Sequence, residues 1–303
     1  MIKSKKTYWL VALFVAALWG SSTVCIKVAY GFFSLSAADT ASQLMFIGAR
    51  FILAGILGEI IFGLSEKTVL RPKTGQAFSH VLVLALLQVF VLYGLYSTGL
   101  ARASGTSGAM INGTSTFFTI LFSTLVFKTE RPTARKFLAC LLGFAAIAVM
   151  NLGGEGAGLT FSLTGEGALL LSQCVSGLCH NITKRFTVTD SPAMLCAWQF
   201  FIGGTALFTA GWLLGGRLQG NASGYAVLLY ISLVSAVTFS LWGKLMQYHP
   251  VSRVNVFSLA NPLFGVLFSA LLLGETQQAF RPQTLLALAM IAGGIVLVCR
   301  KEE

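Results

Sequence analysis

The sequence predicts an all-α integral membrane protein with ten transmembrane helices, arranged as two inverted five-helix repeats around a central cavity. Three observations lead to this fold. Hydrophobic residues make up 55% of the 303 residues and charged residues only 10%, whereas soluble domains carry about 25% charged residues. The apolar residues gather in runs long enough to cross a bilayer as helices. A hairpin with a glutamate in its turn occurs at Glu130 and again at Glu275, 145 positions later (275 − 130).

Ten apolar stretches account for most of the chain and leave little for a soluble domain. Their apolar residues run continuously and do not alternate as in an outer-membrane barrel. The first stretch is too long for the apolar core of a signal peptide, so we expect it to be a retained helix. The expected spans are Tyr8–Tyr30, Gln43–Phe62, Val81–Ala101, Gly108–Phe127, Phe137–Leu152, Gly165–Lys184, Met194–Leu214, Tyr225–Tyr248, Val254–Leu273 and Gln283–Cys299.

The fifth and tenth stretches differ in composition from the others. They consist almost entirely of Ala, Leu, Ile, Val, Gly and Met, and they contain the small pairs Gly143 with Ala146 and Gly293 with Gly294. Small residues let helix backbones approach closely in lipid. We therefore expect these two helices to pack outside a ring of eight more polar ones, and to form the interface if the protein is a homodimer.

The two hairpins divide the chain into halves of similar length. The first repeat covers residues 1–152, the second covers residues 165–303, and a loop of residues 153–164 without Lys or Arg joins them. Because each half has an odd number of spans, the second half must enter the membrane from the opposite face. The halves are then inverted about an axis in the membrane plane, as in many secondary transporters. A match between Arg50-Phe51 and Gln199-Phe200 supports this register.

The net charge of +11 reflects membrane topology and does not indicate nucleic-acid binding. Of the 21 Lys and Arg residues, 15 fall on the side of the N-terminus, 3 on the opposite side and 3 within spans. Cytoplasmic loops carry such an excess of positive charge. We expect a multi-pass protein of the cell (inner or plasma) membrane with both termini in the cytoplasm. Its partners are then the lipid bilayer and a small-molecule substrate.

Acidic residues are nearly absent from the expected spans. Glu59 lies close to the cytoplasmic end of one span, Glu166 lies at the very start of another, and no acid lies near the middle of a span. A carrier of permanent cations needs a deep acid to hold the cation, so this argues against a cationic substrate and against a simple carboxylate proton relay. His80, His180 and His249 are dispersed, and the six cysteines lack metal-ligand spacing. We therefore expect no enzymatic activity, no metal and no cofactor.

Short motifs placed in this frame resemble a known transporter superfamily. They are Trp19-Gly20 in the first span, Arg50-Phe51 in the second, and the turns with Glu130 and Glu275 before the fifth and tenth. The whole chain resembles the drug/metabolite transporter superfamily, and within it the ten-span EamA-type permeases. The resemblance implies a cavity that opens alternately to either side, usually for export of amino acids, metabolites or toxic compounds. The second turn departs from the first by extra residues between Glu275 and Pro282.

Two embedded titratable residues each allow two interpretations. Arg50 lies too deep in the second span to be casually placed, although a long side chain can extend toward the interface. It either anchors a substrate carboxylate or a gate, or it bonds backbone carbonyls as a structural residue. His180 either couples transport to protons, since histidine titrates near physiological pH, or is a neutral hydrogen-bonded helix residue.

Candidates for the cavity wall follow from helical spacing. Asn112 and Thr116 share one face of the fourth span, and Asn255 and Asn261 are their counterparts on the ninth. Pro262 removes a backbone hydrogen bond, which can free a carbonyl or allow a bend. Aromatic side chains and further amides complete a neutral lining. The predicted substrate-binding residues are Trp19, Arg50, Tyr93, Asn112, Thr116, Gln173, His180, Asn181, Trp198, Trp242, Asn255 and Asn261.

A neutral cavity lined by aromatic and amide groups suits a zwitterionic or uncharged amphipathic solute. We therefore predict a secondary-active transporter that exports amino acids or similar small metabolites by alternating access. Two alternatives remain open at this point. One is efflux of drug-like amphiphiles, and the other is a membrane receptor or assembly protein that transports nothing.

Overall fold

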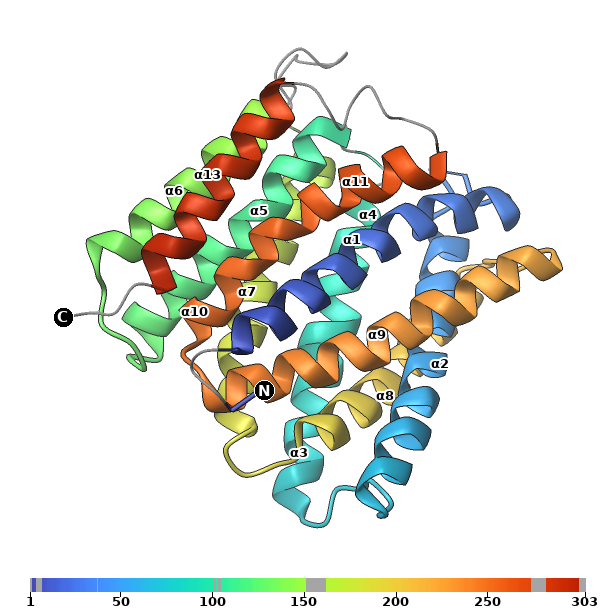
Figure 1. The fold of residues 1–303 in the computed structure, drawn as a ribbon. Coiled ribbons are helices and arrows are strands. Elements are labelled where there is room, and N and C mark those ends of the chain that lie inside the picture. The colour runs from blue at the N-terminus through green and yellow to red at the C-terminus, as the bar shows by residue number, and fades with distance from the viewer. Residues whose placement is uncertain are drawn as a thin grey trace.

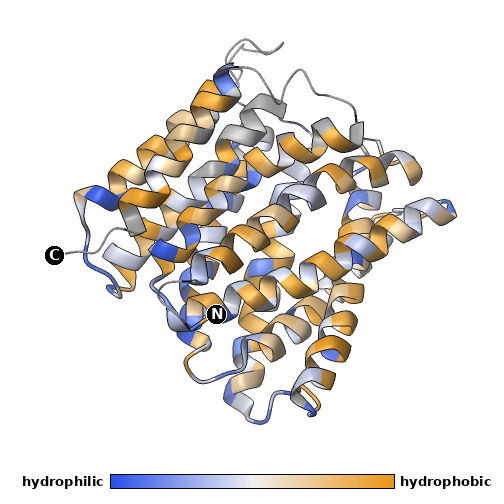
Figure 2. Cartoon of the chain, in the orientation of Figure 1, coloured by the Kyte–Doolittle hydropathy of each residue, from blue (hydrophilic) through white to orange (hydrophobic). Residues whose placement is uncertain are grey.

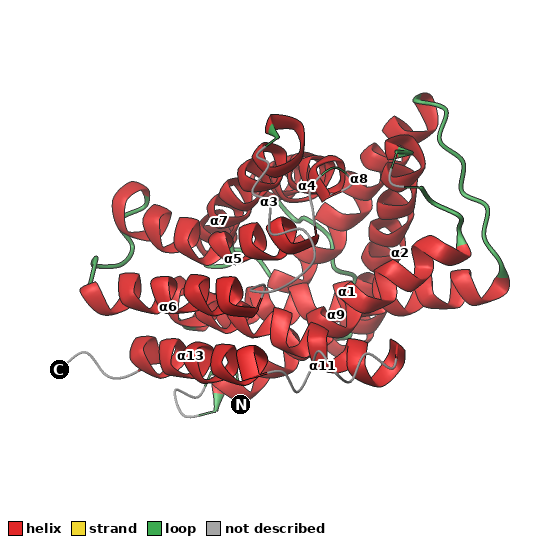
Figure 3. Ribbon diagram, turned by 90° about the horizontal axis from the view of Figure 1, so that it is seen from above, coloured by secondary structure: helices red, strands yellow, loops and turns green. Residues whose placement is uncertain are grey.

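The computed structural model describes residues 2–3, 7–36, 38–100, 102, 105–150, 162–273 and 282–299, and the regular secondary structure in these ranges is helical (Figures 1 and 3). The helices before the linker are α1 Tyr8–Phe32, α2 Thr40–Glu66, α3 Gly75–Leu84, π-helical η1 Ala85–Val91, α4 Leu92–Leu100, α5 Gly105–Leu121, π-helical η2 Phe122–Val126 and α6 Ala134–Met150. Those after it are π-helical η3 Leu163–Gly167, α7 Ala168–Phe186, α8 Pro192–Leu213, α9 Ala222–Tyr248, α10 Val251–Asn255, 3₁₀-helical η4 Val256–Ala260, α11 Asn261–Leu273 and α13 Pro282–Cys299.

Several helices are long and apolar enough to cross a membrane, as the sequence predicts. Hydrophobic residues cover most of their length, and hydrophilic residues gather at helix ends and loops (Figure 2). Shorter apolar helices run over Thr114–Val126 and Leu285–Leu297. The five long spans found in the described residues are Tyr8–Phe32, Thr40–Ser65, Gly75–Gly99, Pro192–Leu213 and Ala222–Tyr248.

Polar side chains fix where the long helices begin. Asp39 precedes α2 and accepts a hydrogen bond from the Ser42 backbone N–H at 3.0 Å, which lowers the pKa of the Asp39 carboxyl. Asn221 caps α9 in the same way, through the Gly224 N–H at 2.8 Å. Each cap satisfies a backbone donor that the first turn of a helix leaves free. At its other end α2 stops at Lys67, which adopts a left-handed conformation.

The closest helix contact in the core joins α2 to α8 at two glycines. A Cβ atom on Gly48 would lie 2.4 Å from the backbone nitrogen of Phe208, and one on Gly204 would lie 2.7 Å from that of Ile52. No real Cβ fits at such distances, so only glycine allows the two backbones to touch. Small residues commonly permit this approach between membrane helices.

The same contact repeats at seven-residue intervals along both helices. Toward the end of α2, Gly55 lies against Ala197, and near its start Ala41 lies against Gly211. The residue numbers rise along α2 as they fall along α8, so the helices are antiparallel. We call this row of three small-residue contacts the α2–α8 seam. At its centre the rings of Phe51 and Phe200 pack with centroids 4.7 Å apart.

The other helix contacts are paired: each contact made by a helix of the first half has a counterpart made by the equivalent helix of the second half. Helix α1 packs on α9 and α11, while α7 packs on α4 and α5. Helix α2 also packs on α9, while α8 packs on η1 and α3. Helices α6 and α13 lie side by side at one edge of the molecule (Figure 1).

The small residues of α6 and α13 are used within the chain. Gly143 faces the Leu259 side chain of η4, and Gly294 faces the backbone of Ala139 on α6. Nothing lies within 4 Å of a Cβ placed on Gly293. Packing inside one molecule thus accounts for Gly143 and Gly294 but not for Gly293, and a homodimer through α6 and α13 remains a prediction.

The turn of the first hairpin fastens the two halves together at one end. Its Glu130 accepts hydrogen bonds from the Ser252 backbone N–H at 3.1 Å and from the Ser252 hydroxyl, and it pairs with Lys136 at 3.0 Å. Ser252 lies in the first turn of α10, where backbone donors need such a partner. The corresponding turn around Glu275, most of the 153–164 linker and the Lys27 side chain lie outside the described residues.

Leucine at Gly48 or at Gly204 should destabilise the protein, because its side chain would need space that the partner helix backbone occupies. We expect each change to lower the apparent melting temperature in detergent by about 5 °C or more, measured by size-exclusion chromatography after heating. Gly293→Leu is the matched control, and it should melt within about 2 °C of the unchanged protein. Equal melting temperatures for all three variants would contradict the close contact.

Candidate functional site

Arg50 is a buried cation in the middle of the molecule. Its side chain is 7% exposed, and its Nε donates to the Ser235 hydroxyl at 3.0 Å while one terminal nitrogen donates to the Ser22 hydroxyl at 3.3 Å. The two ion pairs among the described residues join other groups, His80 with Asp190 and Lys136 with Glu130. A guanidinium remains protonated in proteins, so Arg50 carries a positive charge. It has no carboxylate partner within the described part of the chain.

Tyrosines surround this cation. Tyr30, Tyr93 and Tyr96 lie close enough to Arg50 to interact with it electrostatically. The ring of Tyr93 packs on Phe51 with centroids 4.6 Å apart. We call Arg50 with Ser22, Tyr93 and Ser235 the arginine cluster; it draws on α1, α2, α4 and α9.

A second group of polar side chains extends from Tyr96 across α5 to α7. The Asn112 amide donates to the Tyr96 hydroxyl at 3.4 Å, and the Gln173 amide donates to the Asn112 oxygen at 3.0 Å. Because Tyr96 also lies near Arg50, this group continues the arginine cluster. The structure thus brings together Arg50, Tyr93, Asn112 and Gln173, four of the predicted residues.

A third group is centred on the hydroxyl of Thr119. This hydroxyl lies 3.2 Å from His180 Nδ1 and accepts a hydrogen bond from the Asn255 amide at 3.1 Å. The Asn181 amide donates to the Thr119 carbonyl at 3.0 Å. His180, Asn181 and Asn255 were predicted from the sequence, and their neighbour Thr119 connects them. The Thr119 hydroxyl that His180 contacts is uncharged.

The remaining predicted residues lie at separate places. Thr116 and Ser258 join α5 to η4 through a hydroxyl contact of 3.1 Å. Trp19 and Trp242 pack on each other with ring centroids 4.8 Å apart. The 3₁₀ segment η4 ends immediately before Asn261, whose side-chain oxygen is buried without a partner in the described residues.

Trp198 lies apart from these polar groups and holds a loop. Its indole N–H donates to the Leu70 carbonyl beyond the end of α2. The Leu70 backbone N–H donates in turn to Glu59 at 2.8 Å. Successive residues of a helix point about 100° apart. Because Gln199 points into the molecule, its neighbour Trp198 points to the side, toward the loop.

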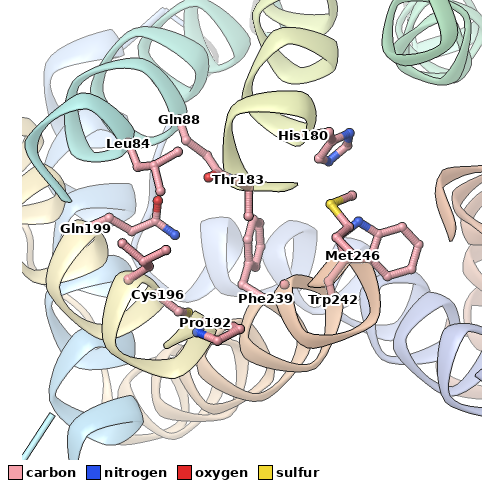
Figure 4. Close-up of a pocket in the computed structure, with 12 residues that line it drawn as sticks. Leu84, Gln88, His180, Thr183, Pro192, Cys196, Gln199, Phe239, Trp242 and Met246 are labelled. Atoms are coloured by element: carbon pink, nitrogen blue, oxygen red, sulfur yellow. The ribbon is translucent and has the colours of Figure 1, made fainter. Parts of the chain in front are cut away.

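A small cavity contains polar residues that the sequence prediction omitted. The cavity lies between four segments of the chain: the continuous helix of α3 and η1, and helices α7, α8 and α9. Its wall includes Gln88, Thr183 and Gln199 as well as the predicted His180 and Trp242 (Figure 4). Its volume is about 20 Å³. Gln88 could have been suspected as a single amide within an apolar run, and Gln199 from its match with Arg50. The π-helical turns of η1, which help to place Gln88, have no sequence signature.

Comparison with known proteins decides the family. A model of the EamA-like transporter family matches residues 6–152 and again residues 163–300. The chain belongs to the EamA-like transporter family. The matches cover nearly the whole sequence and agree with the predicted resemblance to drug/metabolite transporters.

Full-length relatives are also transporters by name. The chain is 26% identical over 307 residues to an S-adenosylmethionine/S-adenosylhomocysteine transporter of Chlamydia muridarum, covering 95% of this chain and 90% of the relative. It is 27% identical over 283 residues to a probable amino-acid metabolite efflux pump of Escherichia coli, covering 88% and 86%. A crystal structure with 18% identity superposes with a TM-score of 0.78 over 97% of both chains, which supports the fold. This EamA-like protein is therefore a multi-pass membrane protein of a transporter family.

Valine at Thr119 should weaken this EamA-like fold, because it leaves the Asn255 amide and the His180 nitrogen without their shared partner. We expect the free energy of unfolding to fall by about 1–3 kcal/mol, measured by denaturant titration in mixed micelles. Thr205→Val is the control, since Thr205 is exposed and its hydroxyl donates to the Phe201 carbonyl of its own helix. That change should stay within about 0.5 kcal/mol, and an equal loss in both variants would contradict the bridging role.

Proposed function

We propose that this protein is a secondary-active transporter that exports amino acids or similar small metabolites by alternating access. The observation that carries the proposal is the buried guanidinium of Arg50, which is held by two serine hydroxyls and lacks a carboxylate partner in the described residues. Charged groups inside a membrane are costly, and they mark substrate or ion pathways. A solute carboxylate would supply the missing negative charge.

The surroundings of Arg50 favour an amino-acid-like solute over a simple anion. A guanidinium can bind a carboxylate through two parallel hydrogen bonds. The nearby Tyr93, Asn112 and Gln173 offer uncharged aromatic and amide surfaces for the rest of the solute. The named solutes of the two relatives, amino-acid metabolites and S-adenosylmethionine, are both related to amino acids. This common chemistry supports the assignment of Arg50 to substrate recognition.

The proposed architecture has ten spans in two inverted halves, with both termini in the cytoplasm. The paired helix contacts support it, since α1 on α9 and α11 corresponds to α7 on α4 and α5. The two family matches, over residues 6–152 and 163–300, support it as well. In transporters of this plan, alternating access is largely a rocking of one repeat against the other. The α2–α8 seam is then the contact about which the halves rock.

Neutralising Arg50 should separate substrate recognition from structure. We expect Arg50→Gln to reduce exchange of amino acids and organic acids in proteoliposomes by about 10- to 100-fold, because a hydrogen bond to a charged group is lost. Exchange of amines that lack a carboxylate should change little. Arg217→Gln, at an exposed position between α8 and α9, is the matched control. Equal loss for acids and amines would leave Arg50 a structural role only.

The orientation of the chain can be tested with C-terminal reporters. Because positive charge is concentrated on the side of the termini, we expect a fused fluorescent protein to fold and emit, and a fused phosphatase that needs the extracellular side to be inactive. Phosphatase activity without fluorescence would reverse the proposed topology.

A further inference from the structure

The cavity of Figure 4 is the internal equivalent of the arginine cluster. Exchanging the halves places Arg50-Phe51 on Gln199-Phe200, an offset of 149 positions (199 − 50). The same offset places the Gly48–Gly204 contact of the seam on the Ala197–Gly55 contact, which is present. It also exchanges α2 with α8, which lines the cavity.

Four polar atoms of the cavity wall have no hydrogen-bond partner in the described residues. The side-chain oxygens of Gln88, Thr183 and Gln199 and the indole nitrogen of Trp242 are all buried without a hydrogen bond. Gln88, Gln199 and Trp242 are only 5%, 4% and 3% exposed. Leaving a buried polar group unpaired is unfavourable, because the group loses its hydrogen bonds to water and gains none in return. Four such atoms around one cavity therefore indicate that something fills it.

The chemistry of the lining restricts what can fill the cavity. It contains no Asp, Glu, Lys or Arg side chain, so an ion would lose its hydration without gaining a counter-charge. The two glutamine amides extend toward the same space from η1 and α8 (Figure 4). Amides and a hydroxyl can both donate and accept, while the indole N–H donates. The matching ligand is an uncharged group that also does both.

The size of the cavity restricts the ligand further. Its volume of about 20 Å³ exceeds the roughly 10–15 Å³ that one water molecule needs. It can therefore hold one small polar group, and a whole amino acid is too large for it. An aromatic layer separates it from Arg50, since Phe200 packs on Phe51 on one side and on Phe239 of the cavity wall on the other.

We propose that this cavity, centred on Gln88 and Gln199, is a second binding site that takes an uncharged hydrogen-bonding end of the transported solute, such as a carboxamide. The inference rests on the proposed transport function and gives the substrate class a second criterion. Arg50 selects a carboxylate on one side of the aromatic layer. The glutamine pair selects a neutral polar side chain on the other side, and because the aromatic layer lies between them, one solute meets the two sites in turn.

The test compares glutamine with leucine, which differ mainly in the carboxamide. Counterflow in proteoliposomes and equilibrium binding of each radiolabelled amino acid in detergent would be measured for the unchanged protein, Gln88→Met and Gln199→Met. Methionine keeps the length of the side chain and removes its hydrogen bonds. We expect both variants to bind and exchange glutamine about 10-fold less well and to handle leucine as before.

Gln283→Met is the matched control, because Gln283 on α13 also has a buried side-chain oxygen without a partner and lies outside the cavity. It should leave both amino acids unaffected. Two results would overturn the second site, provided that the protein without substitutions transports: the cavity variants handle glutamine as before, or they lose glutamine and leucine equally. The occupant of the cavity would then be a structural water. Failure of the unchanged protein to exchange any solute class would instead contradict the transport function.

Discussion

The contact of α2 with α8 is the constraint on which the rest of this structure depends. Three pairs of small residues, spaced seven apart, bring two antiparallel backbones together at the centre of the molecule. In lipid no hydrophobic effect drives helices together, so close packing of this kind must supply the association. Because the seam has Phe51 against Phe200 at its middle, each half contributes an equivalent surface. The seam also fixes which side chains of α2 and α8 point inward, and these include Arg50 and Gln199.

The two halves are similar in shape and different in chemistry. At equivalent positions one half carries the cation Arg50 and the other the neutral amide Gln199. Each side chain lies beside a ring of the central aromatic pair, Phe51 or Phe200. In our account the shape provides two alternating pathways, and the difference in side chains gives the two ends of the solute different partners. In this account the asymmetry of recognition arises from the difference between Arg50 and Gln199 at equivalent positions.

Much of the frame could be predicted from sequence, because helices in a membrane follow continuous apolar runs. The depth of Arg50 in its span indicated burial, and helical spacing selected Asn112 and Asn255 as polar residues of one helix face each. The direction of Trp198 could not be predicted, since it depends on how α8 is rotated against the seam. Gln88 was missed because its setting depends on π-helical turns. The contact between Glu130 and Ser252 was missed because it joins segments 122 positions apart.

The most direct test of alternating access is the accessibility of the two sides of the aromatic layer. Ser235→Cys beside Arg50 and Thr183→Cys in the cavity would be made separately, with the six native cysteines replaced. Each would be exposed to a membrane-impermeant thiol reagent from either face. The account predicts that Ser235→Cys reacts only from outside and Thr183→Cys only from inside, and that substrate raises one rate while lowering the other. Labelling of both positions from the same face, unaffected by substrate, would contradict it.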